Sequence, residues 1–197
     1  YFYNTNGLPP SNPEIEGNYT TTYDVALMSL ELLKYPKILD YTSVWIDHLR
    51  DGDSFLRNTN NLVRFYAGTD GLKTGYTSEA GFCLSATAQR KGMRFLAVVM
   101  NAPSSQARFE ETKKLFSYAF NIHRAILVAN QGDKIAMVNV FKGEKEEIGA
   151  IAKENLTIAV IKGEEDNIIK QIRLNKEVIA PIKPGDKVGE IVVLKGE

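Results

Sequence analysis

Residues 69–102 constrain the fold of this chain more than any other segment. Their sequence, TDGLKTGYTSEAGFCLSATAQRKGMRFLAVVMNA, contains three strand-like runs that short turn signals separate. We expect one strand through or just after Lys73, a second over residues 81–90 and a third over residues 93–102, with a turn at Lys91-Gly92. The period and the turns are typical of antiparallel strands, so the segment predicts an antiparallel sheet.

Helical patterns lie on both sides of these strands. Residues 21–36 contain a capping threonine, Asp24 in the first turn and a run of apolar side chains, and Pro36 is expected to end the helix. A short second helix is expected in PKILDYTS, and a hairpin with its turn at Asp51-Gly52-Asp53 follows it. After the strands, SSQARFEETKKLFSYAFN predicts a helix with an apolar stripe. Helices beside an antiparallel sheet indicate an α+β fold.

The pattern changes near residue 122. Short β-rich runs then follow one another, separated by Lys-Gly, Gly-Asp and Pro-Gly turns, with no long helix between them. This pattern is typical of a small all-β sandwich or barrel. We therefore expect two domains, one over residues 1–121 and a second over residues 122–197.

Charge and composition argue against several kinds of site. Lys plus Arg number 24 and Asp plus Glu number 24, and this zero net charge argues against an electrostatic nucleic-acid binder. The histidines, His48 and His123, lie far apart without other metal ligands at the usual spacing, so we expect no metal and no other cofactor. The single cysteine, Cys83, is expected to be a small buried hydrophobic side chain. No apolar run approaches the length of a membrane span.

The motif Lys73-Thr74-Gly75 carries the clearest chemistry in the chain. A lysine at a strand edge supplies a positive charge that can lower the pKa of a nearby hydroxyl or bind a carboxylate. The Thr74 hydroxyl can donate a hydrogen bond to that carboxylate, and Gly75 leaves room for a substrate backbone beside the strand. Thr77 adds a second hydroxyl and an amide that suits an oxyanion hole. Together these residues favour acyl-transfer chemistry.

Several segments around this motif resemble one enzyme family, in the order that the family shows. They are FYNTNGLP, YTTTYDVALMSLELLKYP, FLRNTNNLVRFYAGTDGLKTGYTSEAGFCLSATA and MRFLAVVMNAPSSQARFEETKKLFSYAF. The chain thus resembles the C-terminal part of a low-molecular-mass penicillin-binding protein, a serine-type D-alanyl-D-alanine carboxypeptidase of the peptidase S11 type. The resemblance implies an α+β fold: part of a β-lactamase/transpeptidase-like domain with an antiparallel sheet and flanking helices, followed by a small all-β domain.

The resemblance also implies roles for individual residues. Lys73 would assist proton transfer at a serine–lysine centre, and it is the predicted catalytic residue. Thr74 would donate a hydrogen bond to the terminal carboxylate of a D-Ala-D-Ala peptide, and Gly75 would allow that peptide to approach the strand closely. Thr77 would lie beside the oxyanion site. All four, Lys73 included, are predicted substrate-binding residues.

A fifth candidate, Arg108, lies outside this motif in SSQARFEE. It matches a family arginine that approaches the substrate carboxylate. The alternative is an ion pair with Glu110 or Glu111 of its own helix, since such surface pairs are common and weak. The residues by themselves leave both possibilities open.

The nucleophile of the family is missing from this sequence. In the family the attacking serine lies in the motif S-x-x-K, with the lysine as its base. Every serine here lacks a lysine three residues later, and the family's S-x-N motif would precede residue 1. We therefore expect a fragment that holds substrate and is inactive alone. The full-length enzyme would remove the terminal D-Ala from peptidoglycan stem peptides through a serine acyl-enzyme.

Partners and location also follow from the resemblance. The implied partners are a stem peptide ending in D-Ala-D-Ala, β-lactams as inhibitors of the full-length form, and the missing N-terminal segment. Such enzymes act outside the cytoplasmic membrane, at the cell surface or on the periplasmic face, and any membrane anchor would lie outside this chain. Two alternatives stay open. One is a non-catalytic cell-wall binding or assembly module with a degenerate penicillin-binding fold, and the other is a β-lactamase relative, against which the β-rich tail argues.

Overall fold

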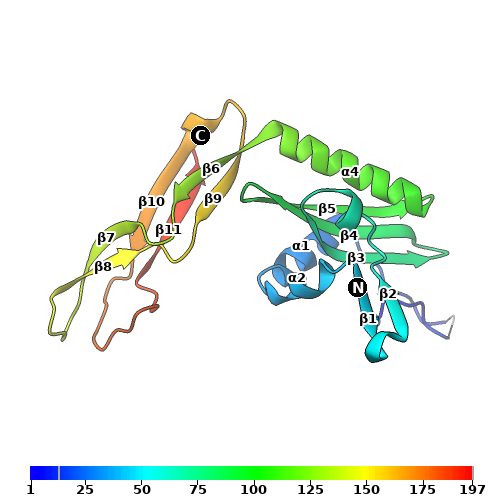
Figure 1. The fold of residues 1–197 in the computed structure, drawn as a ribbon, viewed down its shortest axis with the longest axis horizontal. Helices are drawn as coiled ribbons and strands as arrows, with labels where there is room; N and C mark the ends of the chain where they lie inside the picture. The colour runs from blue at the N-terminus through cyan, green and yellow to red at the C-terminus, as the bar shows by residue number, and fades with distance from the viewer. Residues whose placement is uncertain (13, 197) are drawn as a thin grey trace. The chain divides into compact units, whose positions relative to one another are not determined.

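The computed structural model describes residues 1–12 and 14–196. The chain forms two compact units, residues 1–121 and 122–197 (Figure 1). The first unit combines helices with antiparallel strands, whereas the second is built from antiparallel strand pairs. The α+β fold class predicted from the sequence is therefore confirmed.

The first unit contains the elements predicted around the Lys-Thr-Gly motif. Its helices are α1 (Thr22–Leu32), α2 (Lys37–Thr42), α3 (Leu62–Phe65) and α4 (Ser105–Ile122). Its strands are β1 (Ile46–Leu49), β2 (Ser54–Arg57), β3 (Thr69–Thr77), β4 (Gly81–Arg90) and β5 (Met93–Ala102), with a 3-10 turn (Arg50–Gly52) between β1 and β2. In the described part of the chain, no helix is both long and apolar enough to cross a membrane.

The central sheet has the strand order β3-β4-β5, and each neighbouring pair is antiparallel. The bounds of β4 and β5 are those predicted from the turn signals. Lys91 and Gly92, between these strands, have φ angles of 51° and 79°. Positive φ at both positions is the geometry of a tight type I′ hairpin turn, so the predicted turn is confirmed.

Helices cover both faces of this sheet (Figure 1). On one face, Phe109 and Phe116 of α4 pack in a buried core with Leu84 of β4. On the other face, α1 lies against β4 and β5. There the buried hydroxyl oxygens of Ser29 and Ser85 are 2.7 Å apart. Because strand side chains alternate between faces, Leu84 and Ser85 reach opposite layers.

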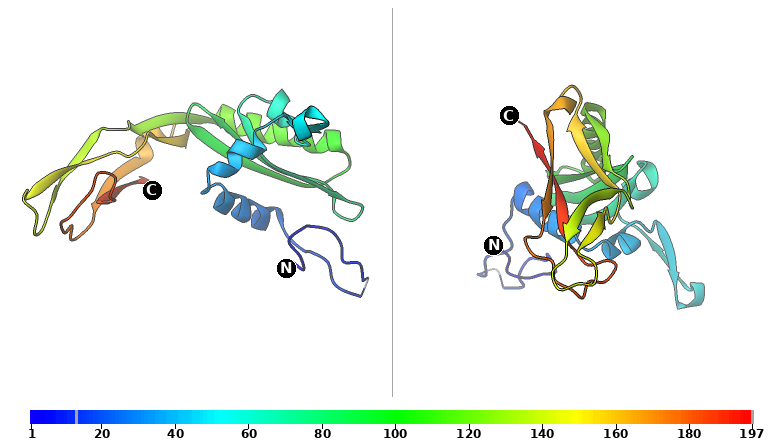
Figure 2. Two further views of the ribbon diagram at one scale, coloured as in Figure 1. Left: turned by 60° about the horizontal axis from the view of Figure 1, so that its bottom comes forward. Right: turned by 90° about the vertical axis from the view of Figure 1, so that its left-hand side faces the viewer.

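Helix α1 begins with the threonine cap that the sequence predicts. The Thr21 hydroxyl accepts a hydrogen bond from the Asp24 amide at 3.1 Å, and the Asp24 carboxylate accepts one from the Thr21 amide at 3.2 Å. The helix ends at Leu32, earlier than the expected end at Pro36. The amides of Lys34 and Tyr35 donate to the carbonyl oxygens three residues earlier, as in a 3-10 turn, instead of four residues earlier as in an α-helix. Figure 2 shows the loop that leads into this helix.

The chain between α2 and β3 forms a hairpin and then one helical turn. β1 pairs with β2, from Ile46 opposite Arg57 to Leu49 opposite Ser54, as predicted. The helical turn α3 is not predicted from the sequence, because four residues are too few to show a helical period. Its first residue, Leu62, is fully buried and fixes the turn against the core.

The second unit is all-β, as predicted. Its strands are β6 (His123–Ala129), β7 (Lys134–Asn139), β8 (Glu147–Ile151), β9 (Leu156–Ile161), β10 (Ile168–Leu174) and β11 (Gly189–Lys195), with a 3-10 turn (Glu165–Asn167) before β10. β6 pairs with β9, β7 with β8 and β10 with β11. A small core that includes Val138, Ala150 and Val178 holds the β7–β8 pair against the chain that follows β10.

Candidate active-site strand

The second half of β3 contains four of the five predicted site residues. Lys73, Thr74, Gly75 and Thr77 follow one another along this strand. Among the described residues β3 pairs with β4 only, so its other edge has no strand partner. An unpaired strand edge is the kind of surface to which an extended peptide adds as a further strand.

The side chains of Lys73 and Thr74 lie on opposite faces of the sheet. Lys73 stands opposite Ser85, which faces α1, and Thr74 stands opposite Leu84, which faces α4. The Lys73 side chain is exposed, and its ammonium group donates a hydrogen bond to the carbonyl oxygen of Thr74. Within the described residues no carboxylate forms an ion pair with Lys73. Its charge is therefore available to a substrate at the strand edge.

The Thr74 hydroxyl is held by a residue that the sequence analysis did not identify. Thr74 is only 7% exposed, and its Oγ1 lies 2.7 Å from Oγ1 of the exposed Thr59. The available signal was the triplet Asn58-Thr59-Asn60, because asparagine side chains often fix the backbone next to a turn. That signal predicts a turn, but it does not say which hydroxyl the turn will reach.

Gly75 is a glycine that the protein's own packing does not require. Its φ is not positive, and a Cβ placed there would meet only Cβ of Cys83, at an ordinary 3.8 Å. A side chain would fit inside the protein, so the room beside Gly75 is available to a bound molecule.

Cys83 is only partly buried, contrary to the prediction of a buried side chain, because its position opposite Gly75 leaves it uncovered on that side.

Thr77 ends β3 and shapes the turn that follows. Its hydroxyl accepts a hydrogen bond from the amide of Ala80 at 3.0 Å. Beside it, the exposed ring of Tyr76 packs on Phe82, with ring centroids 4.3 Å apart. The side chain of Thr77 is thus engaged in the β3–β4 turn.

Arg108 reaches from α4 to the same end of β3. Its Nη1 donates hydrogen bonds to the carbonyl oxygens of Gly75 at 3.1 Å and Cys83 at 3.2 Å. The alternative ion pair with Glu110 or Glu111 is wrong: those carboxylates instead accept from Gln106 and Lys114. Arg108 lies on the buried face of α4, toward the sheet, whereas both glutamates lie on its exposed face. The arginine side chain therefore points away from them.

Arg108 is a buried cation without a carboxylate partner in the described part of the chain. Burial lowers the pKa of its guanidinium, and the nearby Cys83 opposes this effect. The group stays protonated at neutral pH all the same, since an arginine is not deprotonated in proteins. The faces of Phe82 and Phe109 lie 5.5 and 4.8 Å from its central carbon, and its Nε has no hydrogen-bond partner among the described residues. Its Nη2 donates to Oγ of Ser105 at 3.3 Å, so the described residues supply neutral partners but no counter-ion for its positive charge.

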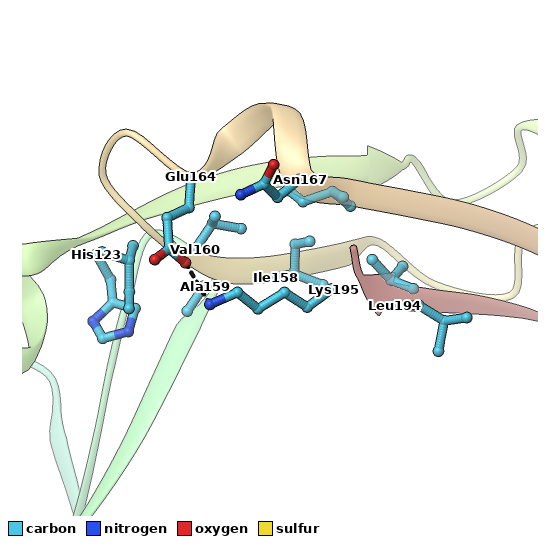
Figure 3. Close-up of a pocket in the computed structure, with 11 residues that line it drawn as sticks. His123, Ile158, Ala159, Val160, Glu164, Asn167, Leu194 and Lys195 are labelled. Atoms are coloured by element: carbon cyan, nitrogen blue, oxygen red, sulfur yellow. Dashed lines mark ion pairs between the residues drawn. The ribbon is translucent and has the colours of Figure 1, made fainter. Parts of the chain in front are cut away.

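A separate pocket of about 330 Å³ lies in the second unit, between strands of the β6–β9 and β10–β11 pairs. Apolar side chains line it, and Glu164 and Lys195 form an ion pair at 2.7 Å at its rim (Figure 3). It contains none of the predicted site residues. Residues 1–12 and 14–196 bring no three His, Cys, Asp or Glu side chains together as metal ligands.

Comparison with known proteins finds one family along the whole chain. Residues 1–104 match the model of the D-alanyl-D-alanine carboxypeptidase family, and residues 124–197 match the C-terminal domain of penicillin-binding protein 5. The D-alanyl-D-alanine carboxypeptidase DacF of Bacillus subtilis is 37% identical over 98% of this chain and 50% of its own length. The corresponding enzyme DacD of Escherichia coli is 30% identical over 89% of this chain and 45% of its own length.

Solved structures agree with these relatives. A peptidoglycan synthesis regulatory factor (PBP3) from Streptococcus pneumoniae matches with a TM-score of 0.73 and 29% identity, over 91% of this chain and 52% of that one. The chain spans about half the length of the curated relatives it matches. The resemblance predicted from the Lys-Thr-Gly region is confirmed, and the chain belongs to the D-alanyl-D-alanine carboxypeptidase family, the serine hydrolases of peptidase family S11.

Proposed function

We propose that this chain is the substrate-holding part of a D-alanyl-D-alanine carboxypeptidase, which removes the terminal D-Ala from peptidoglycan stem peptides. One observation carries the proposal. In a member of this family, the unpaired end of β3 presents an exposed lysine, an unobstructed glycine and a buried arginine with spare charge. A peptide with a terminal carboxylate matches that arrangement in both shape and charge.

Each predicted site residue has a role in this proposal. The stem peptide lies along the open edge of β3, and Gly75 lets its backbone approach. Thr74 donates a hydrogen bond to the terminal carboxylate, and the buried charge of Arg108 attracts the same group. Lys73 assists proton transfer electrostatically. Thr77, at the end of the strand, lies beside the oxyanion site.

The chemistry requires a serine that this sequence does not contain in S-x-x-K form. That serine hydroxyl attacks the carbonyl carbon of the penultimate D-Ala, so an ester forms, the peptide bond breaks and D-Ala leaves with the transferred proton. Water then hydrolyses the ester and restores the serine. We propose that the nucleophile lies in the protein segment that corresponds to the N-terminal half of the relatives, and that the chain alone is inactive.

Exposed apolar side chains on α1 support such a segment. Leu27, Met28 and Leu30 are 48%, 45% and 52% exposed. Large apolar side chains left exposed on one helix are often covered by a further part of a domain. In this arrangement residues 1–121 are the C-terminal part of a transpeptidase-like domain, and residues 122–197 are a separate all-β domain.

The proposed setting is extracytoplasmic, because peptidoglycan lies outside the cytoplasmic membrane. β-Lactams would be trapped at the acyl stage of the reaction. Penicillin-binding protein D2 from Listeria monocytogenes, solved in a cefotaxime-bound form, is 36% identical over 60% of this chain and 47% of that one, with a TM-score of 0.56. This likeness supports the expectation of β-lactam binding by the complete protein.

Labelling with a fluorescent penicillin tests the proposal. The intact natural protein is expected to form a covalent adduct and to release D-Ala from a peptide ending in D-Ala-D-Ala. The 197-residue chain by itself is expected to do neither. A folded intact protein that neither labels nor releases D-Ala would favour the alternative of a non-catalytic cell-wall binding or assembly module.

A further inference from the structure

Thr59 is the exposed member of a hydroxyl pair at the substrate strand. Its Oγ1 lies 2.7 Å from Oγ1 of Thr74, which is 7% exposed. These two residues are 15 positions apart in the sequence, and no other hydrogen bond to either hydroxyl is recorded within the described residues. The contact thus links the turn before α3 to the centre of the Lys-Thr-Gly motif.

The turn that carries Thr59 is fixed on both sides. Asn58 donates from Nδ2 to the carbonyl oxygens of Thr42 and Val44, both at 2.9 Å. Its Oδ1 accepts a hydrogen bond from the Asn60 amide at 2.9 Å. These bonds tie the turn to the end of α2, so the backbone before Thr59 has little freedom to move.

Asn60 ties the other side of the turn to β3 itself. It is 1% exposed and donates from Nδ2 to the carbonyl oxygen of Gly71 at 3.0 Å. Its Oδ1 accepts a hydrogen bond from the Leu62 amide at 3.1 Å. Thr59 is therefore held at a fixed distance from β3 by buried hydrogen bonds, although its own side chain is exposed.

We propose that Thr59 is a positioning residue that orients the Thr74 hydroxyl toward the substrate carboxylate. The inference rests on the proposed function and extends it to a residue outside the Lys-Thr-Gly motif. A hydroxyl has one hydrogen to donate and can accept through its lone pairs, whereas a carboxylate can only accept. When Thr59 donates to Thr74, the single Thr74 hydrogen is free to point at the carboxylate.

The same arrangement strengthens the contact with substrate. A hydroxyl that accepts one hydrogen bond becomes a better donor in the next, because the bonds in a chain polarise one another. Without the Thr59 hydroxyl, the Thr74 hydrogen has no fixed direction. Loss of the Thr59 hydroxyl therefore weakens the binding of a carboxylate while leaving the rest of the site in place.

The test compares Thr59→Val with Thr59→Ser in the intact natural protein. Valine keeps the shape and removes the hydroxyl, so we expect kcat/KM for a peptide ending in D-Ala-D-Ala to fall about tenfold, mainly through KM. Serine keeps the hydroxyl and should restore the wild-type value. Thr20→Val, a half-buried threonine whose hydroxyl has only a 3.4 Å contact with a neighbouring carbonyl, is the control and should change nothing.

Two further measurements separate positioning from a structural role. With a substrate whose terminal carboxylate is replaced by a carboxamide, Thr59→Val should behave as wild type. In a Thr74→Val background, Thr59→Val should cause no further loss, because the two hydroxyls act as one unit.

Several results would overturn the inference. They are wild-type kinetics for Thr59→Val in an active protein, an equal loss with the carboxamide, or an undiminished loss in the Thr74→Val background. An inactive wild-type protein is a different result, because it removes the proposed function and this inference with it.

Discussion

The two halves of β3 differ in what surrounds them. In the first half, Thr69, Gly71 and Leu72 are buried, and the carbonyl oxygens of Asp70 and Gly71 accept hydrogen bonds from α2 and from the turn before α3. In the second half, beginning at Lys73, most residues are exposed and the edge is open. The first half of β3 is therefore anchored by neighbouring elements, whereas the second half, which contains the predicted site residues, is open to solvent.

Two glycines show the same contrast. A Cβ on Gly71 would lie 2.6 Å from Oγ1 and 3.1 Å from Cβ of Thr42, distances that require the neighbours to move. A Cβ on Gly75 would meet only ordinary contact at 3.8 Å. Packing thus requires the first glycine, whereas the second has room that the fold does not use.

The largest expected effect is on chemistry in the second half. Replacing the exposed Lys73 with Ala should slow labelling of the intact protein by fluorescent penicillin about hundredfold or more, because the proposed function places this charge beside the reacting groups. The melting temperature should stay near that of wild type. A Lys73→Ala protein that labels at the normal rate would remove this residue from the mechanism.

The next effect falls on stability in the first half. Gly71→Ala should lower the free energy of unfolding by about 1–3 kcal/mol, since the added methyl group overlaps Thr42. Urea denaturation measures the change. Thr42→Ala removes the Oγ1 atom that the added methyl group would meet, so the double variant Gly71→Ala/Thr42→Ala should lose less stability than the sum of the two single variants. Strictly additive losses would show that this contact is not the cause.

Arg108 links the two strands at the open end. Arg108→Met should reduce penicillin labelling and cost about 1–3 kcal/mol of stability, because the carbonyl oxygens of Gly75 and Cys83 lose their donor. Arg108→Lys keeps the charge but not the planar fork, so we expect an intermediate result. Equal losses for both variants would indicate that the fork matters more than the charge.

The second glycine should separate activity from stability. Gly75→Ala is expected to change the free energy of unfolding by less than about 1 kcal/mol, since a Cβ fits there. Hydrolysis of D-Ala-D-Ala peptides should nevertheless fall about tenfold, because the proposed function places the substrate backbone where the methyl group would stand. If Gly75→Ala lowers the free energy of unfolding as strongly as Gly71→Ala, the two halves of β3 do not differ in their need for glycine.

The smallest effect is expected from the ion pair of Asp70. Its Oδ1 accepts a hydrogen bond from Nη1 of Arg94 at 2.9 Å, its Oδ2 lies 2.8 Å from Nη2 in the ion pair, and both side chains are about three-quarters buried. Asp70→Asn should therefore lower stability by about 1 kcal/mol. Glu31→Gln, in the exposed pair with Lys34, is the control and should change stability by less than about 0.5 kcal/mol in urea denaturation.

Local signals predicted the main strands well. β4 and β5 have the expected bounds because a two-residue turn at Lys91-Gly92 fixes which residues of the two strands lie opposite each other. α1 has its threonine cap for a similar reason, since the capping bonds join residues three apart. The helical turn α3 was missed because it is too short to carry a period.

Contacts between distant residues were beyond such signals. For Arg108 the sequence left an ion pair with a neighbouring glutamate open, but the side chain reaches carbonyl oxygens 25 and 33 positions away. The link between Thr59 and Thr74 has the same character. Which partner a polar side chain meets depends on the packing of whole elements, and spacing along the chain does not contain that information.

The sequence by itself determined the α+β class, the order of strands and helices, and the family to which the Lys-Thr-Gly region belongs. Periodicity, turn residues and an extended motif are local properties, so they can be read without coordinates. Only the tertiary structure decided that β3 is buried in one half and open in the other, that Gly71 is needed by packing whereas Gly75 is not, and that Arg108 is buried against the sheet. The reason is physical: burial and hydrogen-bond partners arise where separate elements meet.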